Sequence, residues 1–393
     1  MKVKKELDRR EFMKSGLVSA LSGGVFLDSF NRTRIINNFF KKDTQKKEED
    51  ENKIEYRKLG STGYNASLLG FGAMITTDPS VLEKALDMGV NYVDTARGYQ
   101  RGNNEIWIGK VIKNRRKNLF LTTKEKAGSK QSLLNGAEES LKALDTDYVD
   151  ALLAHGLSSR SEVLNEDIMS GFEQLKKEGK ARFVGMSTHS NSAEVIDAMI
   201  ESKFYNLVTV KYNFRSDDGL KNAIERANKA GIAVVAMKPM AGGQGYVGSK
   251  MGNLNPFQSA LRWVMNDKNV ATTIPSITSF QQLSENFETM GTKMSWSDRK
   301  ILYKFAKVTD KLYCRMCDVC SGQCPENVKI SDVMRFLMYA EGYGELQLGK
   351  DSYKSLSFHE NASKCIDCGD CVVKCVNKLN IRERMVRANS LLA

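Results

Sequence analysis

The chain has 393 residues, of which 41% are hydrophobic and 8% aromatic, so it can bury a large core and global disorder is excluded. Its formal net charge is +12, but no basic tract with interleaved aromatic residues accompanies this excess, which argues against a nucleic-acid-binding protein. All eight cysteines lie after residue 313, and this clustering favours metal ligands over disulfides spread through the fold.

The N-terminal segment has the pattern of an export signal. Two arginines, Arg9 and Arg10, are followed by an aromatic residue, an apolar residue and a lysine, and then by a weakly apolar run over 15–30. This order resembles the twin-arginine signal, and a basic amphipathic tail is the alternative. We expect residues 1–30 to engage the twin-arginine export machinery, with 31–53 as a charged linker. The protein is then expected to be periplasmic or membrane-tethered.

Residues 54–69 predict a short hairpin. Two strand-like segments, 54–59 and 64–69, flank the turn sequence Gly60-Ser61-Thr62-Gly63. Such an arrangement is typical of paired antiparallel strands. We expect this hairpin to act as a lid on the structure that follows it.

Strand-length apolar segments then alternate with helical patterns. The predicted strands are 67–74, 92–96, 119–124, 148–155, 181–188, 207–213, 231–238 and 271–276. Helices are expected between them, for example over 129–144 and 217–230, where apolar residues recur every three or four positions. Eight strand–helix units over about 225 residues indicate an α/β fold of the (β/α)8 TIM-barrel type. A doubly wound open sheet is the alternative, although no G-x-G-x-x-G follows the first strand.

Three successive strands end in an ionisable residue. These residues are Asp94, Lys124 and His155, and Tyr99 follows Asp94 across a turn. In a barrel the carboxyl ends of the strands meet at the face where chemistry takes place. A lysine ammonium beside a tyrosine stabilises the phenolate and lowers the pKa of the phenol from ~10. We therefore expect Tyr99 to donate a proton and His155 to hydrogen-bond a substrate oxygen.

These four residues, in this order at strand ends, together with the segment 56–63, resemble the aldo/keto reductase family. The resemblance covers about residues 56–290. It implies that a carbonyl on a small or sugar-like molecule is reduced with a nicotinamide cofactor. It also implies that Tyr99 is the general acid, that the lysine and the aspartate tune its acidity, and that the histidine orients the carbonyl.

The resemblance assigns NAD(P)H to this cleft. Ser187 is similar to the family residue that holds the carboxamide, and Glu285 and Asn286 match the adenine contacts. Ser276 lies in the segment that grips the adenosine end. Many family members have basic residues at the positions of Ser276 and Gln282, where they bind the 2′-phosphate. This departure argues against a preference for NADP.

Two further departures concern the nicotinamide end of the cleft. Met237 stands where many members stack an aromatic ring, and Thr209 stands near a usual glutamine. The catalytic set is therefore matched better than the cofactor cleft. A second hypothesis is an electron-transfer or binding protein that uses a catalytically inactive aldo/keto reductase scaffold. The short loop 156–162 leaves the barrel mouth open for a large substrate or for another domain.

The eight cysteines form two runs of identical spacing. The first run is Cys314, Cys317, Cys320 and Cys324, and the second is Cys365, Cys368, Cys371 and Cys375. This is the bacterial ferredoxin pattern for four-iron clusters, in which the fourth cysteine of each run serves the other cluster. We expect two [4Fe-4S] clusters, with Cys375 joining the first run and Cys324 joining the second. Zinc is the alternative, although zinc sites usually pair two C-x2-C knuckles.

The cysteine runs define the last region of the chain. Residues 331–340, between the runs, have helical periodicity and predict an inserted helical arm. We expect a barrel over 54–293 and a helical linker with a small α-helical, ferredoxin-like domain over 294–393. The predicted function is an exported oxidoreductase that couples carbonyl/alcohol interconversion to electron transfer, with a redox partner protein. One cluster is expected near the carboxyl ends of the barrel strands.

Overall fold

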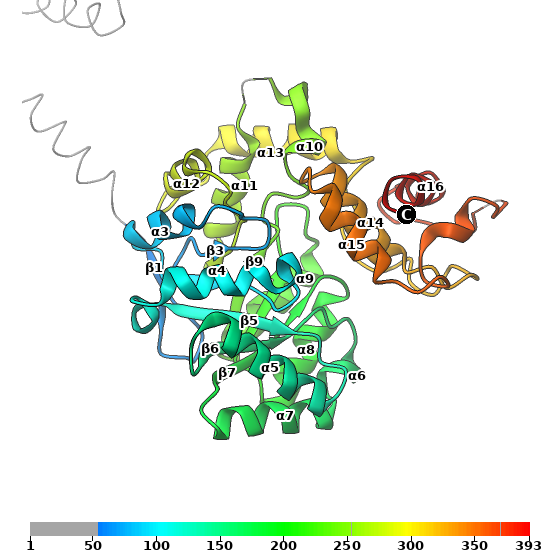
Figure 1. The fold of residues 1–393 in the computed structure, drawn as a ribbon. Coiled ribbons are helices and arrows are strands. Elements are labelled where there is room, and N and C mark those ends of the chain that lie inside the picture. Colours follow the sequence, from blue (N-terminus) through cyan, green and yellow to red (C-terminus); the bar gives the residue numbers. More distant parts are fainter. Residues whose placement is uncertain (1–53, 253, 370) are drawn as a thin grey trace, which may run out of the picture. The chain divides into compact units, whose positions relative to one another are not determined.

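The computed structural model describes residues 54–252, 254–369 and 371–393 (Figure 1). Residues 54–393 form one compact unit. The predicted export signal and charged linker lie outside the described residues. In the part of the chain that the structure describes, no helix is both long and apolar enough to cross a membrane.

Eight parallel strands form the centre of this unit, as the sequence predicts. They are β3 (Phe71–Gly72), β4 (Tyr92–Asp94), β5 (Phe120–Glu125), β6 (Val149–Ala154), β7 (Ala181–Thr188), β8 (Leu207–Lys211), β9 (Ala233–Met237) and β10 (Thr272–Thr273). Each strand pairs with the next one along the chain. Bridges from Leu69 to Thr273 and from Gly72 to Ser276 join the first strand to the last. The sheet is therefore closed into a barrel, and the open-sheet alternative is wrong.

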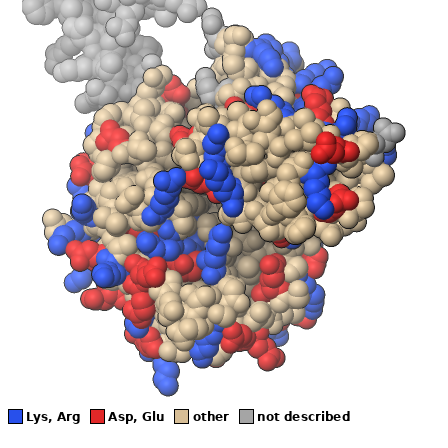
Figure 2. Space-filling view, turned by 45° about the vertical axis from the view of Figure 1, so that its right-hand side comes forward, with Lys and Arg blue, Asp and Glu red and all other residues tan. Residues whose placement is uncertain are grey.

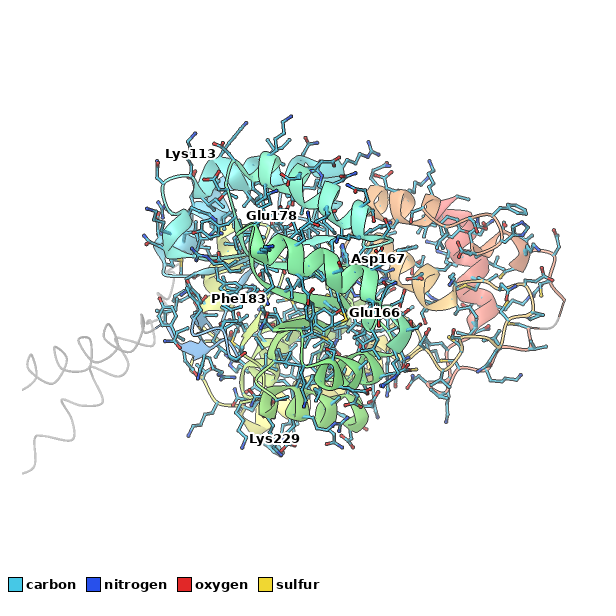
Figure 3. All side chains as sticks on the ribbon, turned by 90° about the horizontal axis from the view of Figure 1, so that it is seen from below. Lys113, Glu166, Asp167, Glu178, Phe183 and Lys229 are labelled. Carbon is cyan, nitrogen blue, oxygen red and sulfur yellow. The ribbon has the colours of Figure 1, made fainter. Side chains whose placement is uncertain are left out.

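Apolar side chains fill the interior of the barrel, and stacked aromatic rings are part of this cluster. The ring of Phe120 stacks between Tyr92, at 5.5 Å, and Phe183, at 6.0 Å. Close strand contacts depend on glycine at one point, because a Cβ added to Gly185 would lie 2.1 Å from the carbonyl oxygen of Leu207. Figure 3 shows Phe183 among the strands, whereas the labelled charged residues lie on the surrounding elements.

Helices surround the strands. They are α3 (Pro79–Asp87), α4 (Asn103–Ile112), α5 (Lys130–Leu144), α7 (Glu166–Lys177), α8 (Ser192–Ser202), α9 (Asp218–Lys229), α11 (Pro256–Met265) and α12 (Phe280–Phe287), with the short helices α6 (Arg160–Val163) and α10 (Gln244–Val247). In α5, Leu133, Ala137 and Leu144 are buried on one face, and Ser129 closes the first turn with a capping box. The predicted helix 129–144 is confirmed.

The predicted hairpin consists of β1 (Tyr56–Lys58) and β2 (Asn65–Ser67), which pair antiparallel. The hydroxyl of Tyr64 donates to the carbonyl oxygens of Asn91 and Asn118, each at 3.3 Å. Both residues lie just before a barrel strand begins. The hairpin therefore covers the amino ends of the strands, away from the face on which the predicted catalytic residues lie.

The remaining helices belong to the C-terminal region. They are α13 (Trp296–Thr309), α14 (Ile330–Glu341), α15 (Leu346–Lys354) and α16 (Ile381–Leu392). We call residues 310–393 the cysteine arm, and α14 confirms the helix expected between the two cysteine runs. The arm shares a buried apolar cluster with the barrel loop after β9, where Ala241 and Tyr246 pack with Tyr313 of the arm.

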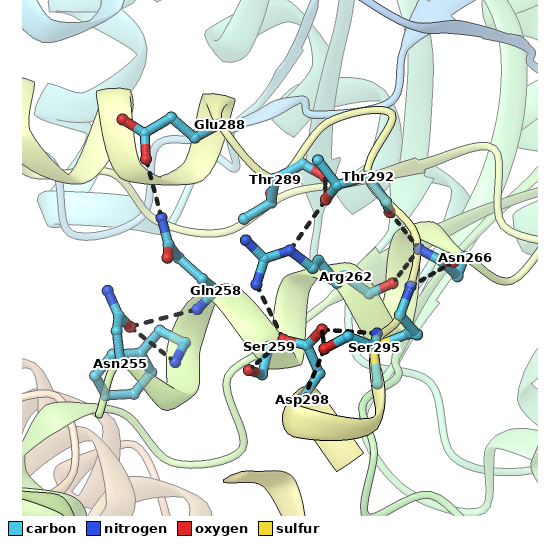
Figure 4. Close-up of polar contacts among 12 residues, drawn as sticks. Asn255, Gln258, Ser259, Arg262, Asn266, Glu288, Thr289, Thr292, Ser295 and Asp298 are labelled. Carbon is cyan, nitrogen blue, oxygen red and sulfur yellow. Dashed lines mark hydrogen bonds and ion pairs between the residues drawn. The ribbon is translucent and has the colours of Figure 1, made fainter. Parts of the chain in front are cut away.

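A buried carboxylate fixes α13, which leads into the arm, to the barrel. Asp298 accepts hydrogen bonds from Ser259 at 2.7 Å and Ser295 at 2.6 Å, and it contacts Arg262 at 3.0 Å (Figure 4). Burial alone would raise the pKa of Asp298, but these contacts lower it to about 2. Asp298 is thus ionised at neutral pH and holds the start of α13 against α11.

Candidate active site at the carboxyl ends of the strands

The structure brings the four predicted catalytic residues together. Asp94 ends β4, Lys124 lies near the end of β5, and His155 directly follows β6. Lys124 Nζ donates to Asp94 Oδ1 at 2.5 Å and to the carbonyl oxygen of Thr95 at 2.7 Å. The same nitrogen lies 5.2 Å from the centre of the Tyr99 ring. The rings of Tyr99 and His155 meet edge to face at 5.9 Å. An acid–base set from three adjacent strands is therefore gathered at one place, at the carboxyl ends of the strands.

Lys124 and Asp94 form a buried ion pair. Their side chains are 1% and 3% exposed. Burial raises the pKa of Asp94 and lowers that of Lys124, and their mutual contact opposes both shifts. The second carboxylate oxygen of Asp94, Oδ2, is buried with no hydrogen-bond partner in the described residues. The site thus keeps one unused acceptor beside the lysine.

The acidity of Tyr99 differs from the sequence expectation. We expected Lys124 to lower the pKa of Tyr99, but burial raises it well above its ordinary value, and the Asp94 carboxylate raises it further. The physical reason is that Lys124 directs its ammonium to Asp94 and Thr95, so that the aspartate cancels much of its charge. Tyr99 is therefore held as a neutral phenol, the form that carries a proton to donate.

Two histidines at the carboxyl ends of the strands, His155 and His189, are held neutral. Burial lowers the pKa of His155 well below its ordinary range, and the charges of Lys124 and Arg335 lower it further. His189, which we assigned no functional role from the sequence, has a pKa shifted in the same direction, by burial and by Arg335 and Lys238. Its Nδ1 is buried and has no hydrogen-bond partner in the described residues. Both imidazoles can therefore donate or accept one hydrogen bond without carrying charge.

The residues predicted to hold a nicotinamide cofactor lie at strand ends and on α12. Ser187, in β7, accepts a hydrogen bond from the backbone N–H of Gly156 at 2.9 Å, which leaves its hydroxyl hydrogen free. Thr209 Oγ1, in β8, and Asn286 Nδ2, on α12, are buried without hydrogen-bond partners among the described residues. Unpaired buried polar atoms are costly, and a bound polar ligand removes the cost. These side chains fit the carboxamide and adenine ends of such a cofactor.

The two other predicted cofactor residues are positioned by backbone and side-chain contacts. Ser276 forms the bridge to Gly72 that helps to close the barrel. Glu285, on α12, accepts from Asn255 Nδ2 at 3.2 Å, and its carbonyl oxygen accepts from Gln258 Nε2 at 2.9 Å. α12 is thereby fixed to α11. Glu285 and Asn286 are adjacent on this anchored helix.

Sequence reasoning missed a polar contact between Lys238 and Tyr339, which lies near the catalytic residues at the mouth of the barrel. Lys238 directly follows β9, and its Nζ donates to the hydroxyl of Tyr339, on α14, at 3.3 Å. The same nitrogen lies 4.8 Å from the centre of the Tyr339 ring and 5.7 Å from that of Tyr343. Burial raises the pKa of Tyr339, but the charges of Lys238 and Arg335 outweigh burial and hold it below its ordinary value. The helical periodicity of 331–340 indicated a helix, but no motif indicated that it would cover the cleft.

The cysteines are grouped as the crossed ligand assignment requires. One cavity is lined by Cys314, Cys317, Cys320 and Cys375. The neighbours of Cys365 are the remaining three cysteines, Cys324, Cys368 and Cys371. Burial, and then these three thiols, raise the pKa of Cys365 to about 11. Each group thus joins three cysteines of one run to the fourth of the other.

No three cysteine, histidine or acidic side chains among residues 54–252, 254–369 and 371–393 are grouped as ligands of a metal ion. Around one zinc ion, Zn–S bonds of ~2.3 Å place the sulfurs ~3.8 Å apart. A four-iron cluster holds its four thiolates farther apart than this. The relevant observation is therefore the cavity that Cys314, Cys317, Cys320 and Cys375 share. These four thiols are the number and type of donor that a four-iron cluster needs.

The first cysteine group lies at the carboxyl ends of the barrel strands. Lys211, the last residue of β8, donates to the carbonyl oxygen of Arg315. Burial lowers the pKa of Lys211, and the nearby Cys314 thiol, Asp217 carboxylate and Cys317 thiol oppose this shift. Asn213, two residues further on, donates to the hydroxyl of Tyr313 at 3.0 Å. The first cysteine run and the catalytic set therefore share one face of the barrel.

Comparisons with known proteins agree with the fold. Residues 76–245 match the aldo/keto reductase family. The chain is 32% identical over 207 residues to YqkF, an uncharacterized oxidoreductase of Bacillus subtilis, and the match covers 48% of this chain and 65% of that protein. The chain thus spans less than two thirds of the length of this relative.

Solved structures match a larger share of the chain. An aldo-keto reductase from Bacillus halodurans, in its holo form, superposes with a TM-score of 0.56 at 26% identity, covering 65% of this chain and 97% of that one. One from Klebsiella pneumoniae, in complex with NADPH, shares the fold with a TM-score of 0.54 at 20% identity, over 65% of this chain and 95% of that one. The barrel of this chain is therefore similar in sequence and in fold to aldo/keto reductases, as the sequence predicts, and these similarities support an oxidoreductase.

Proposed function

We propose that the barrel reduces a carbonyl group on a small or sugar-like molecule, with Tyr99 as the proton donor. The observation that carries this proposal is the contact of Lys124 with Asp94 at 2.5 Å beneath the Tyr99 ring, with His155 edge-on to that ring. As oxygen gains negative charge during reduction, the neutral Tyr99 gives up its proton, and the buried lysine stabilises the phenolate that remains. His155 orients the carbonyl oxygen.

A nicotinamide cofactor would supply hydride in this reaction. Ser187 and Thr209 are assigned to its carboxamide, and Asn286 to its adenine. Within the part of the chain that the structure describes, each has a free hydroxyl hydrogen or an unpaired buried polar atom. Ser276 and Gln282 have no positive charge with which to bind a 2′-phosphate. The proposal is therefore for NAD(P)H without a preference for NADP.

Replacement of Tyr99 by phenylalanine tests the catalytic assignment. Tyr99→Phe keeps the ring and removes the proton, so kcat for carbonyl reduction should fall by ~10²-fold or more. Tyr64→Phe is the matched control, because Tyr64 lies at the opposite, amino ends of the strands. If Tyr99→Phe turned the substrate over at the wild-type rate, Tyr99 would not be the proton donor and the catalytic assignment would be wrong.

We also propose that the cysteine arm holds two [4Fe-4S] clusters with crossed ligands. Support comes from the spacing of the two runs and from the grouping of Cys375 with the first run and Cys324 with the second. Metal analysis should find about eight irons per chain. Cys375→Ser should damage the cluster on Cys314, and measurement of zinc or of about four irons would contradict the assignment.

We propose that the clusters exchange electrons with the barrel site and with a redox partner protein. Support comes from the contact of Lys211 with Arg315, next to the first cysteine run.

A specific observation also favours the second hypothesis, an inactive scaffold for electron transfer or binding, because Tyr339 of α14 covers the mouth of the barrel. Identification of the small molecules released from anaerobically purified protein separates the two. Release of a nicotinamide favours the reductase.

We propose, from the sequence alone, that the protein is exported by the twin-arginine route. The double variant Arg9→Lys, Arg10→Lys should keep folded protein in the cytoplasm, because a receptor reads the arginine pair. Fractionation of cells that make the wild type and the variant measures this. Equal export of both would contradict the proposal.

A further inference from the structure

The positively charged side chains at the barrel mouth outnumber their acidic partners. Lys124 pairs with Asp94, and Arg335 on α14 pairs with Asp332. Lys238 and Lys211 have no carboxylate within ion-pair distance among the described residues, and their only hydrogen-bond partners there are neutral oxygens, the Tyr339 hydroxyl and the Arg315 carbonyl. On the face in Figure 2, Lys and Arg side chains gather beside the hollow in the surface.

These charges converge on the catalytic residues. The positive charges of Arg335 and Lys238 both act on His155 and on His189 and lower the pKa of each imidazole. Both also act on the hydroxyl of Tyr339. The barrel contributes the lysine and the cysteine arm contributes the arginine, so the two meet at the Tyr339 hydroxyl, near Tyr99.

An unpaired ammonium in such a place is costly. Removing a cation from water is strongly unfavourable when no anionic partner replaces the lost hydration. Arg335 is only 18% exposed in its side chain, and its partner Asp332 is turned further to solvent, at 40%. Burial lowers the pKa of Lys238, as expected for a cation that lacks a counter-charge. A bound anion would remove this cost, and Nδ1 of His189 is a further buried polar atom that has no hydrogen-bond partner among the described residues.

We propose that Lys238, Arg335 and Tyr339 bind an anionic group, a carboxylate or a phosphate, of the molecule that occupies the cleft. The lysine and the arginine neutralise the charge, and the Tyr339 hydroxyl donates one hydrogen bond. This inference rests on the proposed function, since it names the substrate class of the same site. An oxo acid would place its carboxylate on this group and its carbonyl toward Tyr99, whereas a cofactor would place a phosphate there.

Direct binding tests the inference without turnover. Calorimetry on the anaerobically purified full chain would use pyruvate as the carboxylate probe, inorganic pyrophosphate as the phosphate probe, and the neutral methyl ester of pyruvate for comparison. Lys238→Met and Arg335→Gln should each raise the Kd of an anionic probe by at least ~10-fold, because each leaves the anion short of one partner. The Kd of the ester should not change.

Two controls separate local charge from overall charge and from misfolding. Lys229→Met removes one positive charge on α9, where Lys229 pairs with Glu225, and should leave every Kd unchanged. Lys238→Arg keeps the charge at the mouth and should restore most of the affinity. A loss confined to pyruvate identifies a substrate carboxylate, and a loss confined to pyrophosphate identifies a cofactor phosphate.

Failure of the inference is distinguishable from failure of the proposed function. If the wild type binds neither anion, or if both mouth variants bind like the wild type, the anion site is excluded. Tyr99-dependent carbonyl reduction in the same preparation would then still support the reductase. Conversely, anion binding that depends on Lys238 without any reductase activity would keep the anion site and remove the reductase.

Discussion

The barrel and the cysteine arm are stabilised in different ways. In the barrel, strands such as β5 and β6 are buried along their whole length, and apolar side chains fill the centre. Beside the cysteines, by contrast, apolar side chains face solvent: Val319, Ile366 and Val376 are 52%, 53% and 62% exposed. The barrel thus has a core made of its own side chains. The cysteine loops expose these apolar groups to solvent, and the proposed clusters are the cross-links that we expect to hold their shape.

Metal removal gives the largest expected difference between the two regions. When iron is removed by a chelator, backbone amides in 314–324 and 365–375 should exchange with solvent at least ~10²-fold faster, because metal-binding energy in such loops is folding energy. Amides in β5 to β9 should keep their protection within a factor of ~2, because their hydrogen bonds are buried in the barrel core. Hydrogen exchange followed by mass spectrometry measures both regions in one sample.

The control for this experiment is the iron-loaded protein treated with a chelator already saturated with metal. Equal loss of protection in barrel and arm would mean that the barrel depends on the clusters as well. Unchanged protection in both cysteine runs would mean that the loops are held by side-chain packing alone, and the comparison would then be wrong.

A smaller effect is expected at Glu125, where proton binding changes the stability of the barrel. Burial raises the pKa of Glu125 from 4.5 to about 7, even though Ser140 donates a hydrogen bond to it at 2.7 Å. The folded state therefore retains a proton that the unfolded chain loses. This contribution to stability is complete below pH ~4.5 and is lost as the pH rises to ~7.

The variant Glu125→Gln should remove this pH dependence. At pH 8 it should raise the free energy of unfolding by about 1–2 kcal/mol, a value reduced from that of a fully buried group because solvent screens part of the charge. At pH 4.5 it should have almost no effect. Denaturant titrations at the two pH values measure this, with Glu225→Gln on α9, whose side chain is 47% exposed, as the control. A gain that is equal at both pH values would point to packing instead of ionisation.

The smallest effect is expected where the two regions meet at the surface. Arg101, two residues after Tyr99, binds Asp351 of α15 through Nη2 at 2.8 Å and Nε at 3.1 Å. The Arg101 side chain is 73% exposed, so this pair should contribute only about 0–1 kcal/mol. Asp351→Asn should therefore change the unfolding midpoint slightly, and less in high salt. A loss of several kcal/mol, independent of salt, would show that the arm supports the barrel through this contact.

The sequence predicted the barrel well because strand and helix patterns are local. The runs 119–124 and 181–188 became β5 and β7 with almost the predicted bounds. The predicted strand 271–276 was too long, since only Thr272–Thr273 pair in β10. Pro275, which follows closely, has no N–H with which to continue the ladder.

The covered mouth could not be predicted in the same way. The contact of Lys238 with Tyr339 joins residues 101 positions apart, and neither belongs to a motif. The expected lowering of the pKa of Tyr99 was wrong because Asp94 competes for the lysine, which depends on distances that sequence spacing does not contain. Metal binding by the cysteines remains a prediction, although the structure places Cys375 beside the first run and Cys324 beside the second.

Backbone contacts between barrel and arm have a consequence for how the mouth is covered. The N–H of Gly245 donates to the carbonyl oxygen of Gly342 at 2.8 Å, and a Cβ added to Gly245 would lie 1.9 Å from the carbonyl oxygen of Glu341. Both surfaces belong to one chain, connected through α13, so their effective concentration is on the order of millimolar however dilute the protein is. Coverage of the cleft is therefore independent of protein concentration, unlike the docking of a separate ferredoxin, which dilution would undo.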